Sequence, residues 1–527
     1  ATGSFSGTPL LFDAAHPPTI GGDPGAVGGE SFRGEIDEVR VWNTTRTGEQ
    51  IAANFRRTVS AGEPGLVSCW RMDEASGTAV SDLTGVRDGS HNGAVTKVSL
   101  QTPVSTVETL YVNTLSGSGP GSLNEVIIRA NGMPDPVTIK VTVDGLIPRT
   151  SGLVFGEPIT GDITIEGNGP DRLRLTSLNG GGLARSFTVT PGGALTLRGL
   201  SIEAGGIGGG PGAIRNSGGT VVLEDCVIRN CQGDRFFGGA CYNSGSFTAR
   251  RCLFANNRSV GGSGEDRGAD SSGGGGGGGG AFGGAIFSES GSLLLEDCSF
   301  VGNWVRGGKG GEGGRNNSAD ETGGGGGAPN AGAGGGGFDV SGGNAGKGGG
   351  GGGGGREADG GDGLFGGGGG GGGASIFGGN GGAGGVSELG GAGGQARSSH
   401  AGGGGGGAGL GGAVCITSGT ATIRRCAFRN NTATGGDGGY GSFGAGSGTA
   451  GQGLGGALYH HPDAYLQASY LSFVDNESSS PGTEDANNLE AATGLMAGFN
   501  FEHTPAAGFG DATGNATVSR FGSPLAD

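Results

Sequence analysis

Charged residues that could act on a substrate recur at one register position of a repeated motif. The position holds Asp225, Arg251, Asp297 and Arg425, each directly before a cysteine. Two carboxylates flanking one bond would suit glycoside hydrolysis. An arginine separates the two aspartates in this column, so the pattern predicts a solvent-facing ion-pair ladder and not a catalytic pair.

Cysteines form a second column, one residue further along the same motif. Stacked cysteines can lie within disulfide distance, but side chains on parallel in-register strands point the same way. We therefore expect buried free thiols that act as small apolar residues. Cys231 and Cys241 are better placed for a disulfide, across a short corner. The four cysteines of the column are Cys226, Cys252, Cys298 and Cys426.

Histidines offer little for metal binding. His460 and His461 are the only adjacent pair. Neighbouring residues on a strand point to opposite faces, so the two imidazoles are not expected to share a metal ion.

The motif that carries these columns returns several times along the chain. Its clearest copy, GGAIFSESGSLLLEDCSFVGN, begins at Gly283. A phenylalanine stands two residues after the cysteine position in four copies, at Phe254, Phe300, Phe428 and Phe473. An asparagine follows three residues later, at Asn257, Asn303, Asn431 and Asn476. Alternating apolar residues in such short runs predict strands and not helices.

A single coil of this length cannot bury its own apolar face, whereas stacked coils bury a continuous column of like residues. The recurring register therefore predicts an all-β fold, a right-handed parallel β-helix with coils about 4.8 Å apart. Cysteine and phenylalanine columns should lie inside. The asparagines should form a ladder of side-chain amides at one turn.

Spacers of unequal length separate the copies. We predict a solenoid over residues 132–500, with insertions at 258–282, 304–410 and 432–454 and a C-terminal segment at 501–527. All three insertions leave the coil at the same corner, so they project from one edge and can meet. Insertions on one face of a solenoid are often its binding face.

Glycine dominates these insertions, with 55 glycines in the 107 residues from 304 to 410. Two interpretations stay open. One is a flexible, disordered brush; the other is a bundle of extended polyglycine helices with three residues per turn, whose neighbours satisfy each other's backbone groups. Apolar residues spaced through the runs favour an ordered lobe. These are Phe338, Leu364, Phe365, Ile376, Phe377 and Leu389.

Composition limits the partners. The net charge of −16 argues against a nucleic-acid partner, and no apolar stretch is long enough for a transmembrane helix. Residues 101–131 are expected to be a linker and a cap for the solenoid. Within them, Ser122 and Glu125 fit a capping box that opens a short amphipathic helix.

Two resemblances follow from longer stretches. GPGSLNEVIIRAN and TIEGNG resemble the start of bacterial secreted right-handed β-helix proteins, and the GGA and FxxN repeats resemble those of chlamydial polymorphic outer membrane proteins. The resemblance implies a surface or secreted protein with an adhesive or structural role. It also implies an extracellular location and partners that are either the protein itself, neighbouring surface proteins or glycans.

The first hundred residues carry a different resemblance. FRGEIDEVRVWNTTRTGEQIAANF is similar to the closing strands of laminin-G-like, concanavalin-type jelly rolls. We expect residues 1–100 to be part of such a domain, a partial β-sandwich. The family often binds glycans or calcium, so Asp37 and Glu38 are weak candidates for a structural calcium ion. A buried structural carboxylate is the favoured interpretation.

The leading functional hypothesis is therefore a non-enzymatic extracellular structural or adhesive protein. It would combine a β-helical stalk with a glycine-rich contact lobe and could form filaments. The alternative is a polysaccharide-binding or polysaccharide-degrading β-helix protein. The motif set of the pectin hydrolases is absent from the sequence, and no cofactor is expected.

Overall fold

A computed structural model describes most of the chain from residue 108 to residue 480 and parts of the regions before and after it. It divides into two compact units, Ala1–Val107 and Glu108–Asp527. The described residues are 19–20, 36, 38–47, 50–51, 59, 61–72, 74, 77–91, 108–133, 135–149, 158–177, 187–203, 212–234, 238–267, 272–314, 323–327, 339–375, 382–397, 400–480, 489–491, 501–502 and 516–518.

In the N-terminal unit, the described residues form two antiparallel strand pairs. Strand β1 (Val39–Trp42) pairs with β2 (Leu66–Trp70), and β3 (Ala79–Val80) pairs with β4 (Gly89–Ser90). The buried carboxylate of Asp82 accepts hydrogen bonds from the backbone amides of Cys69 and Thr84 and so ties the second pair to the first.

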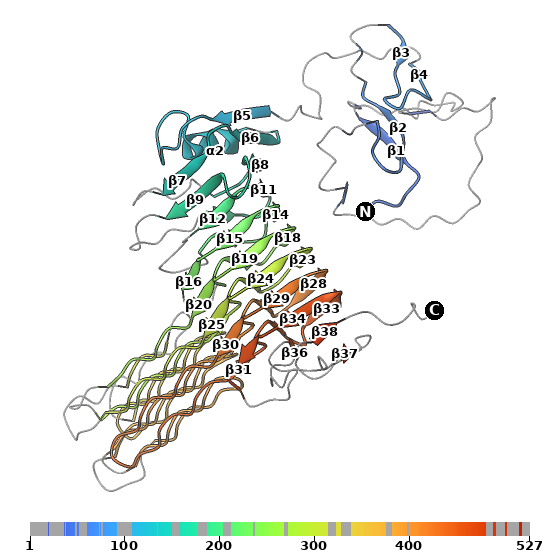
Figure 1. Ribbon diagram of the computed structural model, residues 1–527. Coiled ribbons are helices and arrows are strands. Elements are labelled where there is room, and N and C mark those ends of the chain that lie inside the picture. Colours follow the sequence, from blue (N-terminus) through green and yellow to red (C-terminus); the bar gives the residue numbers. More distant parts are fainter. Residues whose placement is uncertain are drawn as a thin grey trace, which may run out of the picture. The chain divides into compact units, whose positions relative to one another are not determined.

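The second unit is a parallel β-helix (Figure 1), and its regular structure is almost entirely β. Three long sheets run along it. The first contains β5 (Glu108–Val112), β6 (Val137–Val141), β8 (Asp162–Glu166), β11 (Ala194–Arg198), β14 (Thr220–Glu224), β18 (Ser246–Arg250), β23 (Ser292–Glu296), β28 (Gly419–Arg424) and β33 (Ala464–Ser469).

The second long sheet follows the first around each coil and is closed at one end by two antiparallel strands. Its parallel strands are β7 (Gly145–Arg149), β9 (Leu173–Ser177), β12 (Ser201–Glu203), β15 (Val227–Arg229), β19 (Leu253–Ala255), β24 (Ser299–Val301), β29 (Ala427–Arg429) and β34 (Leu471–Val474). The closing strands are β38 (Ala516–Val518) and β37 (Phe501–Glu502).

The third long sheet completes the coil. It contains β10 (Phe187–Val189), β13 (Ile214–Asn216), β17 (Cys241–Asn243), β22 (Ile286–Ser288), β27 (Val414–Ile416), β32 (Leu458–His460) and β36 (Leu489–Ala491).

Two short sheets form where the spacers leave and rejoin the coil, so the first and last residues of each long spacer are strands. The outgoing sheet contains β16 (Gln232–Asp234), β20 (Arg258–Val260), β25 (Trp304–Arg306), β30 (Thr432–Thr434) and β35 (Glu477–Ser478). The returning sheet contains β21 (Ala281–Phe282), β26 (Gly409–Leu410) and β31 (Gly453–Leu454).

The corner after each returning strand requires glycine. Gly283 and Gly411 have positive φ values of 53° and 68°. A Cβ on the next residue, Gly284, would lie 1.9 Å from the carbonyl oxygen of Gly412. Only glycine fits both positions, which explains why the GG pair recurs in every long-spacer copy.

Helix α2 (Leu123–Asn131) covers the N-terminal end of the core. Its N-cap Ser122 accepts a hydrogen bond from the Glu125 amide, and the Glu125 side chain accepts one from Gly121. The apolar face of the helix is buried, including Leu123 and Ile127. The helix thereby shields the open end of the solenoid from water.

Candidate interaction surface

Phenylalanines stack in a file inside the coil. Phe254 pairs in register with Phe300, and Phe300 pairs with Phe428. Both ring pairs have centroids 4.9 Å apart and nearly parallel planes, at 4° and 7°. Phe473 continues the file at 5.2 Å. The rings are 0–1% exposed, so the file forms a continuous apolar spine.

Asparagines form a hydrogen-bonded ladder at the next turn. The Asn257 side-chain amide donates to Oδ1 of Asn303 at 2.9 Å, and Asn303 donates to Asn431 at 3.0 Å. Asn431 donates in the same way to Asn476 at 2.9 Å. Each Oδ1 also accepts the backbone N–H of the preceding rung. Because these side chains are buried, the reciprocal bonding removes the cost of unpaired polar groups.

A second buried polar column crosses the third long sheet. Asn216 donates its side-chain amide to Oδ1 of Asn243 at 2.9 Å, and Asn243 donates to the Ser288 hydroxyl at 3.1 Å. We did not predict this column from the sequence. Its signal is the recurring Asn-Ser-Gly or Ser-Glu-Ser-Gly that begins two residues after an apolar residue, and it ends when Ile416 takes the position.

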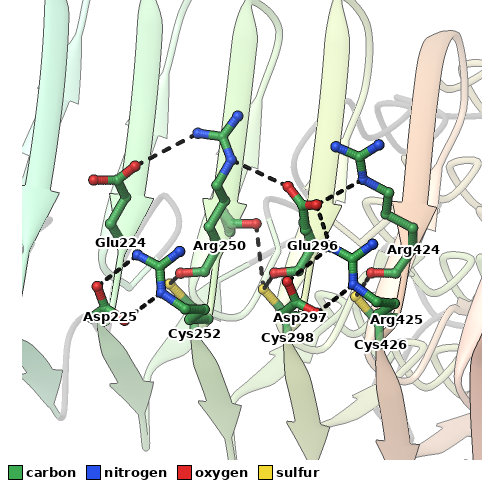
Figure 2. A network of polar contacts seen from close by, with 12 residues as sticks. Glu224, Asp225, Arg250, Cys252, Glu296, Asp297, Cys298, Arg424, Arg425 and Cys426 are labelled. Atoms are coloured by element: carbon green, nitrogen blue, oxygen red, sulfur yellow. Dashed lines mark hydrogen bonds and ion pairs between the residues drawn. The ribbon is translucent and has the colours of Figure 1, made fainter. Parts of the chain in front are cut away.

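The charged column forms an ion-pair ladder on the surface of the coil (Figure 2). Arg251 binds Asp225 through two hydrogen bonds of 2.7 and 2.8 Å, and Arg425 binds Asp297 in the same way at 2.7 and 3.0 Å. All four residues have φ near +53°. The guanidinium of Arg251 lowers the pKa of Asp225, and that of Arg425 lowers the pKa of Asp297.

An adjacent ladder, one residue earlier, was missed by the sequence analysis. Glu224, Arg250, Glu296 and Arg424 face each other across neighbouring strands. Arg250 lies 3.6 Å from Glu224 and 3.3 Å from Glu296, and Arg424 lies 3.0 Å from Glu296. Alternating charge at the last position of each strand run is the sequence signal that identifies it.

Carboxylates of both ladders are therefore held by arginine. A shallow surface depression lies over this region, lined by Asp297, Ser299, Arg425, Ala427 and Tyr470. Since Asp297 is bound to Arg425 on both oxygens, the depression contains no carboxylate free to take a proton from a substrate. The geometry is that of a structural ladder.

All eight cysteines are buried, including Cys231 and Cys241. Cys231 and Cys241, the pair better placed for a disulfide, are not joined by one. In the column, thiols donate to backbone carbonyls, as Cys298 does to Glu296 at 3.2 Å and to Ala249 at 3.4 Å. Contact with Cys226 and Cys298, together with burial, raises the pKa of Cys252, which keeps this thiol protonated.

Only one of the two candidate calcium ligands lies among the described residues. Asp37 lies outside the described residues. Glu38 is half-buried and accepts two hydrogen bonds from Arg40 at 2.8 and 3.0 Å, with Arg71 at 3.4 Å on its other oxygen. Both carboxylate oxygens are therefore neutralised by arginine. Among the described residues, no group of three His, Cys, Asp or Glu side chains is placed to hold a metal ion.

The two histidines have separate environments. His460 is buried and its Nε2 lies 2.7 Å from the carbonyl oxygen of Ala464. Burial lowers its pKa. The His461 ring packs edge-on against Phe365, with centroids 5.0 Å apart. The pair faces different neighbours.

Glycine-rich segments from the three long spacers run side by side away from the coil (Figure 1). We call this part the glycine-rich lobe and define it as the described residues of 261–280, 307–408 and 435–452. An aromatic cluster fixes the lobe to the coil: Phe282 stacks on Phe287 at 5.2 Å and on Phe365 at 5.7 Å. Lys347 adds an ion pair with Glu289 of 3.4 Å.

The other apolar residues expected to order the lobe differ in their packing and exposure. Leu389 packs against the same aromatic cluster, whereas the neighbour of Phe365, Leu364, is 54% exposed. Phe338, Ile376 and Phe377 lie outside the described residues. The anchoring therefore depends on one phenylalanine and one leucine of the long insertion.

Backbone hydrogen bonds inside the lobe repeat every three residues. Along 272–280, three consecutive amides donate to three different neighbouring segments, and the fourth amide donates to the same segment as the first. The donor–acceptor pairs are Gly274–Gly354, Gly275–Gly402, Gly276–Glu265, Gly277–Gly351, Gly278–Gly405 and Gly279–Gly262, at 2.7–3.1 Å. The carbonyls of 272–280 accept from three further segments. The neighbours are 261–267, 306–314, 323–327, 348–355, 366–374 and 401–408.

Segments 272–280, 366–374 and 401–408 are buried throughout and form the interior of the lobe. They contain the uninterrupted runs Gly273–Gly280, Gly366–Gly373 and Gly402–Gly407. A Cβ on Gly277 would lie 2.0 Å from the carbonyl oxygen of Gly368. No side chain fits at such positions, so uninterrupted glycine runs fill the enclosed parts of these segments, and the buried Ser272, Ala374, Ala401 and Ala408 stand only at their ends.

Two perimeter segments, 306–314 and 434–441, carry side chains three positions apart that are exposed or half-buried. On 306–314 the residues are Arg306, Lys309 and Glu312; on 434–441 they include Asp437 and Tyr440. Lys309 pairs with Glu312 at 3.4 Å. The three-residue period of the backbone thus places the charged and aromatic side chains of these two segments on the outer surface of the lobe.

Side-chain oxygens cap several outward-facing amides of the perimeter. Asp359 accepts from the Ala383 amide at 2.6 Å, and Asp362 accepts from Val386 at 2.8 Å. Further caps are Asp266 on Glu312, Glu265 on Gly325, Thr449 on Ala392 and Ser447 on Gly441. Capped amides cannot pair with another backbone, as in the protected edges of β-sheets.

Comparison with known families concerns the N-terminal unit. Residues 1–52 match the model Laminin_G_3, described as the concanavalin A-like lectin/glucanases superfamily. This match supports the jelly-roll resemblance of the first segment. The search among curated proteins found no match to the chain. No helix among the described residues is long and apolar enough to cross a membrane.

Proposed function

We propose that the protein is an extracellular structural or adhesive surface protein. The β-helix acts as a rigid stalk, and the perimeter of the glycine-rich lobe is the contact surface. The lobe is a bundle of polyglycine helices with three residues per turn. The resemblance of the GGA and FxxN repeats to the polymorphic outer membrane proteins supports the location and the adhesive role.

The observation that carries this proposal is the division of the lobe into an all-glycine interior and a side-chain-bearing perimeter. The described interior leaves no room for a small ligand, since a Cβ added at Gly274–Gly278 or Gly402–Gly407 would lie only 1.9–2.1 Å from a neighbouring backbone oxygen. Recognition by the lobe must therefore use its outer face. A broad, rigid face with exposed Tyr440 and Phe443 suits a macromolecular surface better than a small molecule.

The test is binding of the purified chain to printed arrays of polysaccharides, collagen and fibronectin. A lobe variant, Lys309→Ala with Tyr440→Ala, should lose at least tenfold in binding. A matched coil variant, Arg251→Ala, changes a similarly exposed charge away from the lobe and should bind like the wild type. Equal binding by all three proteins would overturn the lobe as the contact surface.

A second candidate function is binding or degradation of polysaccharide. The match of residues 1–52 to the lectin and glucanase superfamily favours it. Incubation with polygalacturonate, alginate and β-glucans would decide between the candidates. Release of unsaturated or reducing sugar ends would replace the structural role with an enzymatic one.

A further inference from the structure

We propose that segment 445–452 of the lobe is a docking edge for an extended lobe segment of a second copy of this chain. This inference rests on the proposed structural role of the lobe and adds the site, the partner and the symmetry of its self-association.

The hydrogen bonds of this segment define the edge. Its amides follow the three-residue pattern: Gly448 and Gly451 donate to segment 435–441, and Gly446, Thr449 and Gln452 donate to segment 389–396. The third set of amides, Ser447 and Ala450, donates to no other residue in the described part of the chain. Both residues are exposed. These two N–H groups, three residues apart, could extend the backbone hydrogen-bond lattice of the lobe to a further segment.

On the perimeter segment 382–386, side chains cover two amides that have the same spacing. Ala383 and Val386 stand three residues apart on segment 382–386, and aspartates cap both of their amides. No side chain among the described residues caps the amides of Ser447 or Ala450. The edge at 445–452 is therefore open where a comparable edge is closed.

Charge also favours this edge. The chain carries a net charge of −16, so two copies repel each other over most of their surfaces. The exposed residues of 445–452 and of the neighbouring segment 390–396 are uncharged. They are Ser447, Thr449, Ala450, Gln452, Ala392 and Gln395. A second copy can approach this strip without placing like charges in contact.

The polarity of the lattice determines the symmetry. Between neighbouring segments the backbone bonds run one way: 445–452 donates to 389–396, whereas the Ala392 amide donates to the Thr449 hydroxyl and not to a backbone carbonyl. A donor edge must therefore meet an acceptor edge on the second copy. When the donor edge of one copy meets the acceptor edge of the next without reciprocation, the contact is heterologous and produces rings or open filaments.

The experiment is sedimentation velocity of the purified chain over a hundredfold concentration range, with the variant Ala450→Pro. Proline removes the amide hydrogen, and its fixed φ fits the extended threefold conformation, so the lobe itself should persist. Resistance of the lobe to trypsin verifies that. The wild type should form assemblies larger than dimers, and Ala450→Pro should weaken them at least tenfold. Ala450→Ser keeps the amide and should behave like the wild type.

Three results would overturn the docking edge: a wild type that stays monomeric, assemblies that stop at dimers, or an Ala450→Pro variant that assembles normally. A monomeric wild type that still binds the polysaccharide or matrix arrays would leave the proposed adhesive function standing. Loss of array binding with intact assembly would overturn the adhesive function and leave the docking edge standing.

Discussion

Asn303 donates its side-chain amide to Oδ1 of Asn431, 3.0 Å away, although 128 positions separate the two residues in the chain. The long insertion that intervenes does not disturb the register of the coil on either side of it. The stacked coils and the glycine-rich insertions are thus independent parts of the fold, and each can be tested separately.

The asparagine ladder predicts a large cost for a single truncation. Asn303→Ala removes acceptors for the backbone and side-chain amides of Asn257 and a donor to the carbonyl of Phe254. We expect the free energy of unfolding to fall by about 3 kcal/mol, since buried polar groups lose their partners. Urea denaturation followed by circular dichroism measures it. Thr420→Ala, an exposed position of β28, serves as control and should change little.

The phenylalanine file predicts a packing defect of similar size. Phe300 is fully buried between Phe254 and Phe428, so Phe300→Ala should cost about 3–5 kcal/mol in unfolding free energy. Phe443 is 78% exposed, and Phe443→Ala should cost less than about 0.5 kcal/mol. Equal costs for the two variants would contradict the stacked interior.

Acid should weaken the ion-pair ladders. Partial burial opposes ionisation of Glu296, but hydrogen bonds from Arg424, Arg425 and Arg250 prevail and lower its pKa. A carboxylate whose pKa is lowered on folding stabilises the protein above its unfolded pKa of about 4.3. This stability is lost as the pH falls through the folded value. Unfolding free energies measured at pH 6, 4.5 and 3.5 should decline more steeply for the wild type than for Glu296→Gln.

Identical slopes for the two proteins would show that Glu296 titrates alike in the folded and unfolded chain. High salt gives a second check. Because these ion pairs lie near the surface, 1 M sodium chloride should reduce the difference between wild type and variant.

Because the thiols are buried, we predict that they react slowly with a reagent in solution. The native protein should not react rapidly with a water-soluble disulfide reagent. In the denatured chain all eight cysteines should react, each releasing one equivalent of thiol from the reagent. Burial also raises the pKa of Cys415, which slows its thiolate chemistry further. Fewer than eight equivalents in the denatured chain would reveal a disulfide, and Cys231 with Cys241 would be the first pair to examine.

Tight packing in the lobe predicts that an added methyl group is not tolerated in its interior. Gly277→Ala places a Cβ 2.0 Å from a backbone oxygen, so the surrounding segments must separate. Trypsin should then cleave at Lys309 and Lys347 faster than in the wild type. Gly325→Ala is the matched control, because its Cβ meets only the end of the Glu265 side chain at 3.3 Å. Similar cleavage of both variants would argue against a packed lobe.

The fold was predictable because the same residue types recur at the same register positions. A column such as Phe254, Phe300 and Phe428 can be aligned by eye, and parallel strands must stack it. The second polar column was missed because its residue type changes from asparagine to serine and then to Ile416. Periodicity in one residue type is a strong signal, whereas a position that changes type carries none without the structure.

The lobe could be predicted only in part. The sequence indicates where glycine runs begin and end, and steric exclusion explains why the enclosed segments are pure glycine. It does not indicate which run neighbours which, since Gly273–Gly280 and Gly366–Gly373 are identical in sequence. Pairings such as Gly277 with Gly351 depend on how the spacers leave and rejoin the coil. That information is topological and lies in the order of the strands.

Hydrogen–deuterium exchange of the glycine-rich segments tests the account most directly. If the lobe is a bonded lattice, amides in 272–280, 366–374 and 401–408 will exchange as slowly as those of β23 and β28 in the coil. If these amides exchange at the rate of an unstructured peptide while the coil stays protected, the insertions are a flexible brush. The contact surface and its docking edge would then both be refuted.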